Sequence, residues 1–328
     1  MADGIAGTPG AAASPPFSDS LPATQRRRFA TLGWGVLAYN VAVILWGALV
    51  RATGSGAGCG GHWPLCNGEV LPKISQIATV IELTHRVMSG VALVLVAVMF
   101  AKSRKFFAHG HAARRWATWS LVFIVTEALL GASLVLLGHV AGNESVGRVY
   151  SLALHLVNTF LLLASLALAA RFATQPEVPV ARPFSLSMAG PLIALILVAV
   201  AGAITALGDT LFPSHTLIEG MRNDFSSTAN FLIRLRIIHP FLAVATGFVV
   251  ALVALPEYRA RRTVRLRALA GWLLALFAAQ FAVGASSIIL QAPLPVQLLH
   301  LFLADALWIT LVLFTAEHGT RRASSLDD

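Results

Sequence analysis

The chain has 328 residues, of which 57% are hydrophobic and 12% are charged, and its mean hydropathy is +0.75. Soluble domains carry about 25% charged residues, so this composition excludes a water-soluble globular protein. The formal net charge is +9, but the basic residues cluster between apolar runs, which argues against a nucleic-acid-binding protein and for a protein of the lipid bilayer.

The N-terminal residues 1–28 are predicted to form a disordered tail, since Ala, Gly, Pro and Ser dominate them. Three arginines precede the first apolar run, as in a signal peptide, but that run ends in Arg51 and a glycine-rich loop instead of a small-residue cleavage site. Runs long enough to span a bilayer recur along the chain. They lie near residues 30–50, 78–100, 116–138, 150–170, 186–207, 234–255, 268–290 and 297–316. We therefore predict an all-α membrane protein with eight transmembrane helices.

The orientation follows from the basic residues. With the N-terminus inside, 17 of the 24 lysines and arginines lie in segments on the same side as the tail. Basic residues accumulate on the cytoplasmic side of membrane proteins. Both termini are therefore predicted to be cytoplasmic, in a plasma membrane of bacterial type.

The two halves of the sequence share landmarks in the same order, at offsets of 145 to 155 residues. This repeat predicts two pseudo-symmetric four-helix bundles with the same orientation, residues 29–172 and 184–318. The landmarks are Gly47 and Gly202, His85 and His239, Gly131 and Gly284, and His155 and His300.

The four repeated histidines lie in the outer portions of the even-numbered helices. Each half thus offers two imidazoles at similar depth, which can clamp one metal inside a bundle. Ligation by two histidines suits haem iron, whereas zinc usually takes three or four protein ligands. The alternative is that each histidine is a hydrogen-bonded core residue. The remaining histidines lie in predicted loops or at helix ends and receive no ligand role: His62, His109, His111, His139, His215 and His318.

Charged residues accompany the histidines. Glu82 lies three residues before His85 on the same helix face, within reach of a haem edge, where a carboxylate could transfer protons. Its alternative role is a structural ion pair with Arg51 or Arg86. Arg86 and Arg236 are candidate partners of haem propionates, or else extend to the lipid headgroups.

Further polar residues fall inside the predicted helices. Glu127 aligns with Gln280 and is interpreted as a hydrogen-bonding residue of the bundle interior, with a proton path as the alternative. Asn158 and Asp305, on the helices of His155 and His300, are candidates for supporting the ligands. The polar loop 208–233 receives no mechanism.

At these motifs the sequence resembles the haem A synthase family. The resemblance covers roughly residues 29–318. It is carried by TGSGAGC at residues 53–59, WPLCNG at 63–68, ELTHR at 82–86, and the His-Leu pairs that begin at residues 155 and 300.

The resemblance implies an enzyme that oxidises the ring methyl of haem O to a formyl group through hydroxylated intermediates. It implies a substrate haem between His85 and His155, and a cofactor haem b held by His239 and His300. It also assigns the catalytic carboxylate to Glu82.

The resemblance further implies that Cys59 and Cys66 form the outer-loop cysteine pair, as a disulfide that either staples the loop or takes part in redox chemistry. Two cysteines are otherwise too few for a disulfide scaffold, and their spacing does not indicate zinc. Some family members have a second cysteine pair, which this chain lacks. Pro240 follows His239 where an arginine follows the first-half ligand, and we expect it to bend the sixth helix.

Two other functions stay open: a di-haem electron-transfer cytochrome, and a haem exporter or chaperone. Glu82 and the cysteine loop favour the enzyme, because electron transfer requires neither. Expected partners are haem O delivered by a haem O synthase, and an electron acceptor that the sequence does not identify. The sequence is compatible with a homo-oligomer.

Overall fold

The computed structural model describes residues 22–70, 72–73, 76–175, 186–214, 216–260 and 263–324. In these ranges all named elements are helices, and eight are long and apolar enough to cross a membrane. This confirms the predicted all-α membrane fold. The long helices are α1 (Ala23–Ala52), α2 (Ile77–Phe106), α3 (Ala112–Leu136), α4 (Val146–Phe172), α5 (Leu186–Leu211), α8 (Ile238–Ala260), α9 (Val264–Ile289) and α10 (Leu294–Ser324). The short ones are η1 (Ser55–Ala57), α6 (Leu217–Asp224) and α7 (Phe231–Leu235).

The first helix begins earlier than expected. Residues 23–28, assigned from sequence to the tail, belong to α1, because arginine is a good helix former and continues the helix beyond the apolar segment. Residues 1–21 lie outside the described ranges, as do four residues used in the sequence predictions: Arg182, His215, Arg261 and Arg262.

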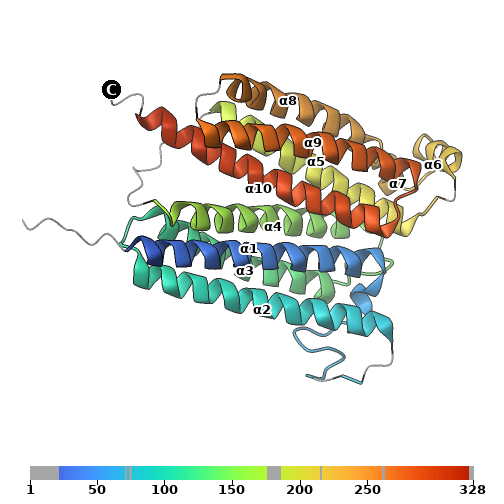
Figure 1. Cartoon of the computed structure of the whole chain (residues 1–328). Helices are drawn as coiled ribbons and strands as arrows, with labels where there is room; N and C mark the ends of the chain where they lie inside the picture. Colours follow the sequence, from blue (N-terminus) through green and yellow to red (C-terminus); the bar gives the residue numbers. More distant parts are fainter. Residues whose placement is uncertain are drawn as a thin grey trace, which may run out of the picture.

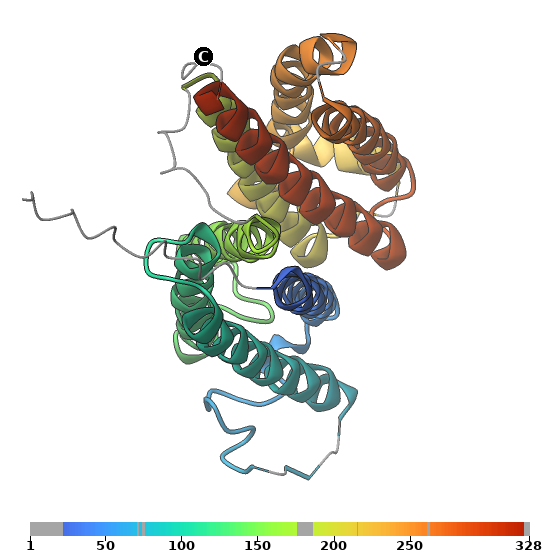
Figure 2. The same cartoon turned by 60° about the vertical axis from the view of Figure 1, so that its left-hand side comes forward.

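The helices form two groups (Figure 1), with α1 to α4 in one and α5, α8, α9 and α10 in the other. A view turned toward the helix ends shows α1 and α4 facing α5 and α10 (Figure 2). Between the groups, the indole N–H of Trp308 donates to the Phe160 carbonyl at 2.7 Å, and the two rings stack with centroids 4.9 Å apart. The internal pseudo-symmetry of the two groups stays a prediction.

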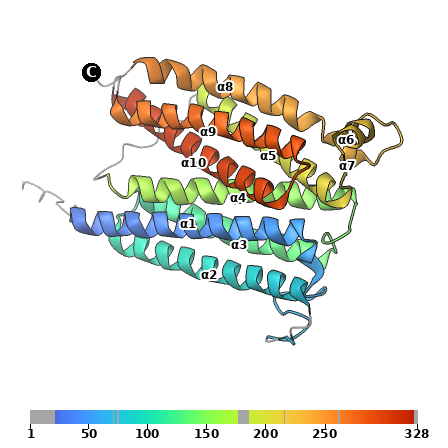
Figure 3. The same cartoon turned by 45° about the vertical axis from the view of Figure 1, so that its right-hand side comes forward.

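The described ends of the bundle differ. The start of α1 and the end of α10 lie at one end, and the loop after α1 lies with α6 and α7 at the other (Figure 3). With an even number of spans, the start of the first helix and the end of the last helix lie on the same side of the membrane. The loop predicted over 208–233 is largely helical, because α5 continues to Leu211 and α6 and α7 follow.

The sixth span is interrupted as Pro240 predicts. It runs over Phe231–Ala260, but α7 ends at Leu235 and α8 begins at Ile238. Proline has no N–H to donate to the carbonyl four residues earlier, which belongs to Arg236 at the interruption. Pro240 itself then lies in the first turn of α8, where proline is tolerated.

Candidate functional site

A cavity of about 1370 Å³ lies among the helices and is lined from both groups. It exceeds the roughly 300–1,000 Å³ of most small-molecule pockets. All four histidines predicted as ligands line it: His85, His155, His239 and His300. The predicted ligands therefore face a common space large enough for a bulky ligand.

The second-half pair consists of His239 on α8 and His300 on α10. Their ring centroids are 6.3 Å apart and their planes are 84° apart. A metal–nitrogen bond of about 2 Å, plus about 1 Å from nitrogen to ring centre, gives about 6 Å across a metal held by two opposed imidazoles. The spacing fits iron bound from both sides.

The hydrogen bonds of the second-half pair differ in which ring nitrogen they engage. Nδ1 of His239 lies 3.1 Å from the Val198 carbonyl oxygen, so Nδ1–H donates and Nε2 keeps its lone pair. Nε2 of His300 lies 3.3 Å from the amide nitrogen of Gln280 and accepts from it, so among the described residues Nδ1 is the nitrogen of that ring without a hydrogen-bond partner. In the described part of the chain, no three His, Cys, Asp or Glu side chains gather as a site for a bare metal.

The first-half pair consists of His85 on α2 and His155 on α4. Behind His155 stands Glu127 of α3, with Oε1 3.5 Å from Nδ1 of the ring. Glu127 accepts hydrogen bonds from Asn158 Nδ2, at 2.6 Å, and from the Thr159 hydroxyl. Asn158 is thus linked to His155 through Glu127, and Glu127 also lines the cavity.

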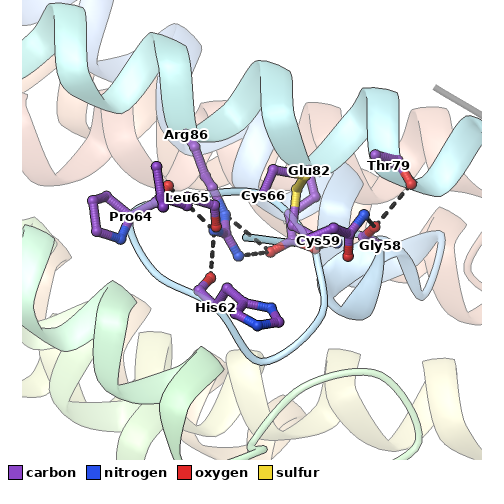
Figure 4. Close-up of polar contacts among 10 residues, drawn as sticks. Gly58, Cys59, His62, Pro64, Leu65, Cys66, Thr79, Glu82 and Arg86 are labelled. Carbon is purple, nitrogen blue, oxygen red and sulfur yellow. Dashed lines mark hydrogen bonds and ion pairs between the residues drawn. A yellow bond between two sulfur atoms is a disulfide. The ribbon is translucent and has the colours of Figure 1, made fainter. Parts of the chain in front are cut away.

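Glu82 is buried, with 3% of its surface exposed, and lines the same cavity. Its Oε2 accepts from the Cys59 N–H at 2.8 Å, and its Oε1 accepts from Arg86 at 2.5 Å and 3.2 Å (Figure 4). Charge-assisted hydrogen bonds of this kind offset the burial of a carboxylate. The structure therefore contains the ion pair with Arg86 that was one alternative for Glu82, whereas Arg51 is engaged elsewhere.

The loop after α1 is fastened to α2 by these groups. Cys59 and Cys66 form a disulfide with a Cα–Cα distance of 4.4 Å. Nη1 of Arg86 donates to the carbonyls of His62 and Leu65, each at 2.6 Å (Figure 4). All three guanidinium nitrogens of Arg86 thus contact protein oxygens.

Arg236 is placed differently. Its Nη1 lies 2.7 Å from Asp209, its Nε lies 3.2 Å from Asp224, and it lines the cavity. Among the described residues, its buried Nη2 has no hydrogen-bond partner. Burial raises the pKa of Asp224, and the neighbouring Arg236 opposes that rise. The free Nη2 could receive an anionic group in the cavity.

Two further arginines line the cavity; sequence reasoning considered Arg51 only as a partner of Glu82 and gave Arg148 no role. Arg51 of α1 donates to the Ala206 carbonyl and the Thr210 hydroxyl, both at 2.6 Å, and to Gln297 at 3.0 Å. It therefore joins the first helix to α5 and α10. Arg148 is buried and donates to two loop carbonyls. An arginine at the end of an apolar run looks like an ordinary interfacial residue, so the sequence contains no signal for either role.

Asp305 of α10 is almost fully buried, with 1% of its surface exposed, and it lines the cavity. Within the described ranges, neither carboxylate oxygen has a hydrogen-bond partner. It lies five residues after His300 on the same helix, but the structure contains no hydrogen bond between Asp305 and that ring. Its predicted support of the ligand stays a prediction.

The fold and the site define a multi-pass helical membrane protein with two pairs of half-buried histidines around one cavity. Residues 30–312 match the model of the cytochrome oxidase assembly protein family, and the chain belongs to this family.

Relatives carry two kinds of name. A protein named "Protoheme IX farnesyltransferase" from Thermus thermophilus is 43% identical over 301 residues, which are 90% of this chain and 50% of that protein. A protein named "Heme A synthase" from Bacillus mycoides is 48% identical over 96 residues, 29% of this chain and 31% of that protein. The chain thus spans about half the length of the Thermus relative. The predicted resemblance to the haem A synthase family is confirmed.

Proposed function

We propose that the chain is a haem A synthase, an oxidoreductase that converts the ring methyl of haem O to a formyl group through a hydroxylated intermediate. One observation carries the proposal. Two histidine pairs face one cavity, and a buried carboxylate held by Arg86 and by the Cys59 N–H, Glu82, lies beside the first pair. A di-haem cytochrome would need both pairs but not this carboxylate.

The two pairs take different haems in this proposal. His239 and His300 hold haem b, which supplies one-electron chemistry when bound. His85 and His155 bracket the substrate haem in the first half, residues 29–172. The 6.3 Å centroid spacing and the Val198 contact support the haem b assignment.

Glu82 handles protons in this scheme. Oxidation of a methyl to a formyl group, with water as the oxygen source, releases protons together with electrons. Glu82 lines the cavity, and its contacts with Arg86 and the Cys59 N–H hold its carboxylate in place for that transfer. The disulfide shares this network through Cys59, so we assign Cys59 and Cys66 to holding the loop that orients Glu82.

Cations at the outer end of the cavity suit haem propionates. Arg236 has the free Nη2 for such a contact. Arg86 would have to exchange one of its loop carbonyls for a propionate oxygen. We therefore propose Arg236 as the stronger propionate partner of the two.

Haem O synthase is the proposed source of substrate. Farnesylation of protohaem makes haem O, and a relative named for that reaction contains a region 43% identical to this chain. The unmatched half of that relative leaves room for a second activity in one polypeptide. Electrons pass to an acceptor outside this chain.

We place the protein in a bacterial plasma membrane with both termini in the cytoplasm. The start of α1 and the end of α10 share one end of the bundle, while the disulfide loop lies at the other, where an oxidising compartment permits it. A membrane-impermeant thiol reagent, applied to intact cells after reduction, should label Cys59 and Cys66. Labelling that appears only after lysis would reverse the orientation.

The function is tested by pigment analysis. The chain is expressed with a haem O-producing enzyme, and the haems are extracted from the purified protein. Haem A or hydroxylated haem O supports the proposal, whereas haem b alone in both sites supports a di-haem cytochrome. His239→Ala and His300→Ala should each abolish the low-spin haem b absorbance, while His109→Ala, in an exposed contact with Arg114, should not.

A further inference from the structure

Each of the four ligand histidines packs against a glycine of the preceding span. The pairs join α1 to α2, α3 to α4, α5 to α8 and α9 to α10, and in every pair Cε1 is the ring atom nearest to the glycine. The pairs are Gly47 with His85, Gly131 with His155, Gly202 with His239, and Gly284 with His300.

These contacts leave little room for a side chain on the glycine. A Cβ added at Gly202 would lie 2.8 Å from Cε1 of its histidine, and one at Gly47 or Gly284 would lie at 3.0 Å. Carbon atoms in favourable contact are about 3.5–4.0 Å apart. At Gly131 the distance is 3.8 Å, which is an ordinary contact. A methyl group at Gly202 would therefore force the ring to shift, and one at Gly47 or Gly284 would require the ring to move by a few tenths of an ångström.

A second contact comes from one helical turn before the glycine. The Val198 carbonyl, four residues before Gly202, lies 3.1 Å from Nδ1 of His239. Gln280, four residues before Gly284, lies 3.3 Å from Nε2 of His300. Positions i and i+4 share a helix face, so one helix contacts the same ring with both a polar group and the glycine backbone.

The first half repeats this arrangement once. Glu127, four residues before Gly131, lies 3.5 Å from Nδ1 of His155. At His85 the corresponding residue is the apolar Val43, and within the described ranges Nδ1 of His85 has no hydrogen-bond partner. His239 and His300 are thus held by a hydrogen bond and a glycine. His155 has a carboxylate 3.5 Å from Nδ1 without a hydrogen bond among the described residues, and His85 has its glycine alone.

We infer that these four glycines are positioning residues, which fix the imidazole rings for metal ligation. The inference rests on the proposed function, in which the histidines ligate haem. A side chain at the glycine pushes the ring away from its polar partner on the same helix and changes its approach to the metal. Glycine is a poor helix former compared with alanine, so helix stability alone gives no reason for glycine at these sites.

Close helix packing is the competing explanation for a small residue in a membrane helix. Gly33 on α1 illustrates that role, since a Cβ there would lie 2.9 Å from the Cβ of Ala170 and touches no histidine. Gly33→Ala is therefore the matched control for packing. Gly35→Ala on the same helix is the control for the substitution itself, because a Cβ there meets nothing within 4 Å.

The test uses the purified full chain loaded with haem b. Gly202→Ala and Gly284→Ala should shift the low-spin ferric electron paramagnetic resonance signal and weaken haem retention by about tenfold, as loss of a ligand-supporting contact typically does. The shift should be larger for Gly202→Ala. If the Gly202→Ala protein fails to fold or express, Gly284→Ala, whose added Cβ is farther from its histidine, still provides the test.

The controls separate the possible failures. Gly33→Ala should lower thermal stability with an unchanged spectrum, and Gly35→Ala should change neither. Wild-type spectra and haem content in both Gly202→Ala and Gly284→Ala would overturn the inference, as would an equal spectral shift in Gly33→Ala. If His239→Ala also kept the wild-type spectrum, the proposed ligation itself would fail. If His239→Ala lost the low-spin spectrum while Gly202→Ala and Gly284→Ala kept it, only the role of the glycines would be overturned.

Discussion

The two histidine pairs line one cavity but have opposite charges beside them. Three residues before His85 stands a carboxylate, Glu82, and three residues before His239 stands a guanidinium, Arg236. Glu82 is neutralised by Arg86 and fastens the disulfide loop. Arg236 lies between two carboxylates and keeps one nitrogen free. In the proposed function, the same place in the two halves thus handles protons in one and binds an anionic group in the other.

The side chains next to His155 and His300 also differ in charge between the two halves. A carboxylate, Glu127, stands 3.5 Å from His155, and a neutral amide, Gln280, stands 3.3 Å from His300. A carboxylate partner raises the basicity of a histidine ligand more than an amide does. The first half therefore has a carboxylate near each of its histidines, whereas the nearest polar contacts of His239 and His300 are a backbone carbonyl and an amide. This difference supports a reacting haem in the first half and a permanent haem in the second.

Glu82→Gln should have the largest effect on the difference between the two halves. The amide keeps the shape of the side chain but cannot accept the proton released during methyl oxidation. We expect formyl production to fall about 10²–10⁴-fold, the usual contribution of general acid–base catalysis. Haem b at His239 and His300 should remain, because neither residue contacts Glu82. Pigment analysis should show accumulated haem O or its hydroxylated form.

Arg236→Gln is the matched control for that experiment, because it changes the residue at the same place in the other half. It should weaken retention of haem b and leave the proton chemistry of the first half intact. Near-normal haem A production by well-folded Glu82→Gln would remove Glu82 from the mechanism. Loss of protein yield in place of activity would assign Glu82 to the loop alone.

Glu127→Gln places a neutral amide beside His155, as Gln280 does beside His300. The substitution keeps hydrogen-bonding capacity toward Asn158 and Thr159 but removes the charge beside His155. Mutations behind a metal ligand typically cost about 10–100-fold in affinity or activity, so haem titration of the first-half site should weaken within that range. The reverse change, Gln280→Glu, should alter the haem b spectrum. Unchanged binding and spectra in both variants would show that these partners do not tune their ligands.

Much of this arrangement could be predicted from the sequence. Eight apolar runs specified the spans, because a bilayer-crossing helix needs about 20 apolar residues. The spacing of Glu82 and His85 placed both on one helix face. The interruption before Pro240 followed from the missing N–H of proline.

Other features depend on which helix faces meet, and the sequence does not specify that. Arg51 contacts Ala206 and Thr210, which lie more than 150 residues away. Gly202 was visible as a repeat landmark, but its contact with His239 depends on the rotation of two helices. The polar loop 208–233 concealed α6, whose residues Gly220 and Met221 line the cavity.

The smallest expected effect concerns the opposite end of the bundle, where the two halves differ in their helix caps. α3 begins with His111, whose Nδ1 accepts from the Ala113 N–H at 3.1 Å, and α9 begins with Thr263, whose hydroxyl accepts from the Leu266 N–H at 3.2 Å. An imidazole can accept at Nδ1 only while that nitrogen is unprotonated. Of these two caps, only the one at α3 can therefore be removed by acid.

Burial lowers the pKa of His111 below its usual value of 6.5, with the nearby charge of Arg26 acting in the same direction and the Gln175 carbonyl opposing it. As the pH falls through 6.5, the unfolded chain takes up a proton before the folded chain does, so stability decreases until folded His111 also protonates. His111→Thr should remove this dependence and keep the cap. Since a cap contributes about 1 kcal/mol, the Tm difference between about pH 7.5 and about pH 5.5 should shrink by about 2 °C. Thr263→Ser, a cap that acid does not affect, should leave the wild-type pH dependence unchanged, and an equal change in both variants would contradict a titrating cap.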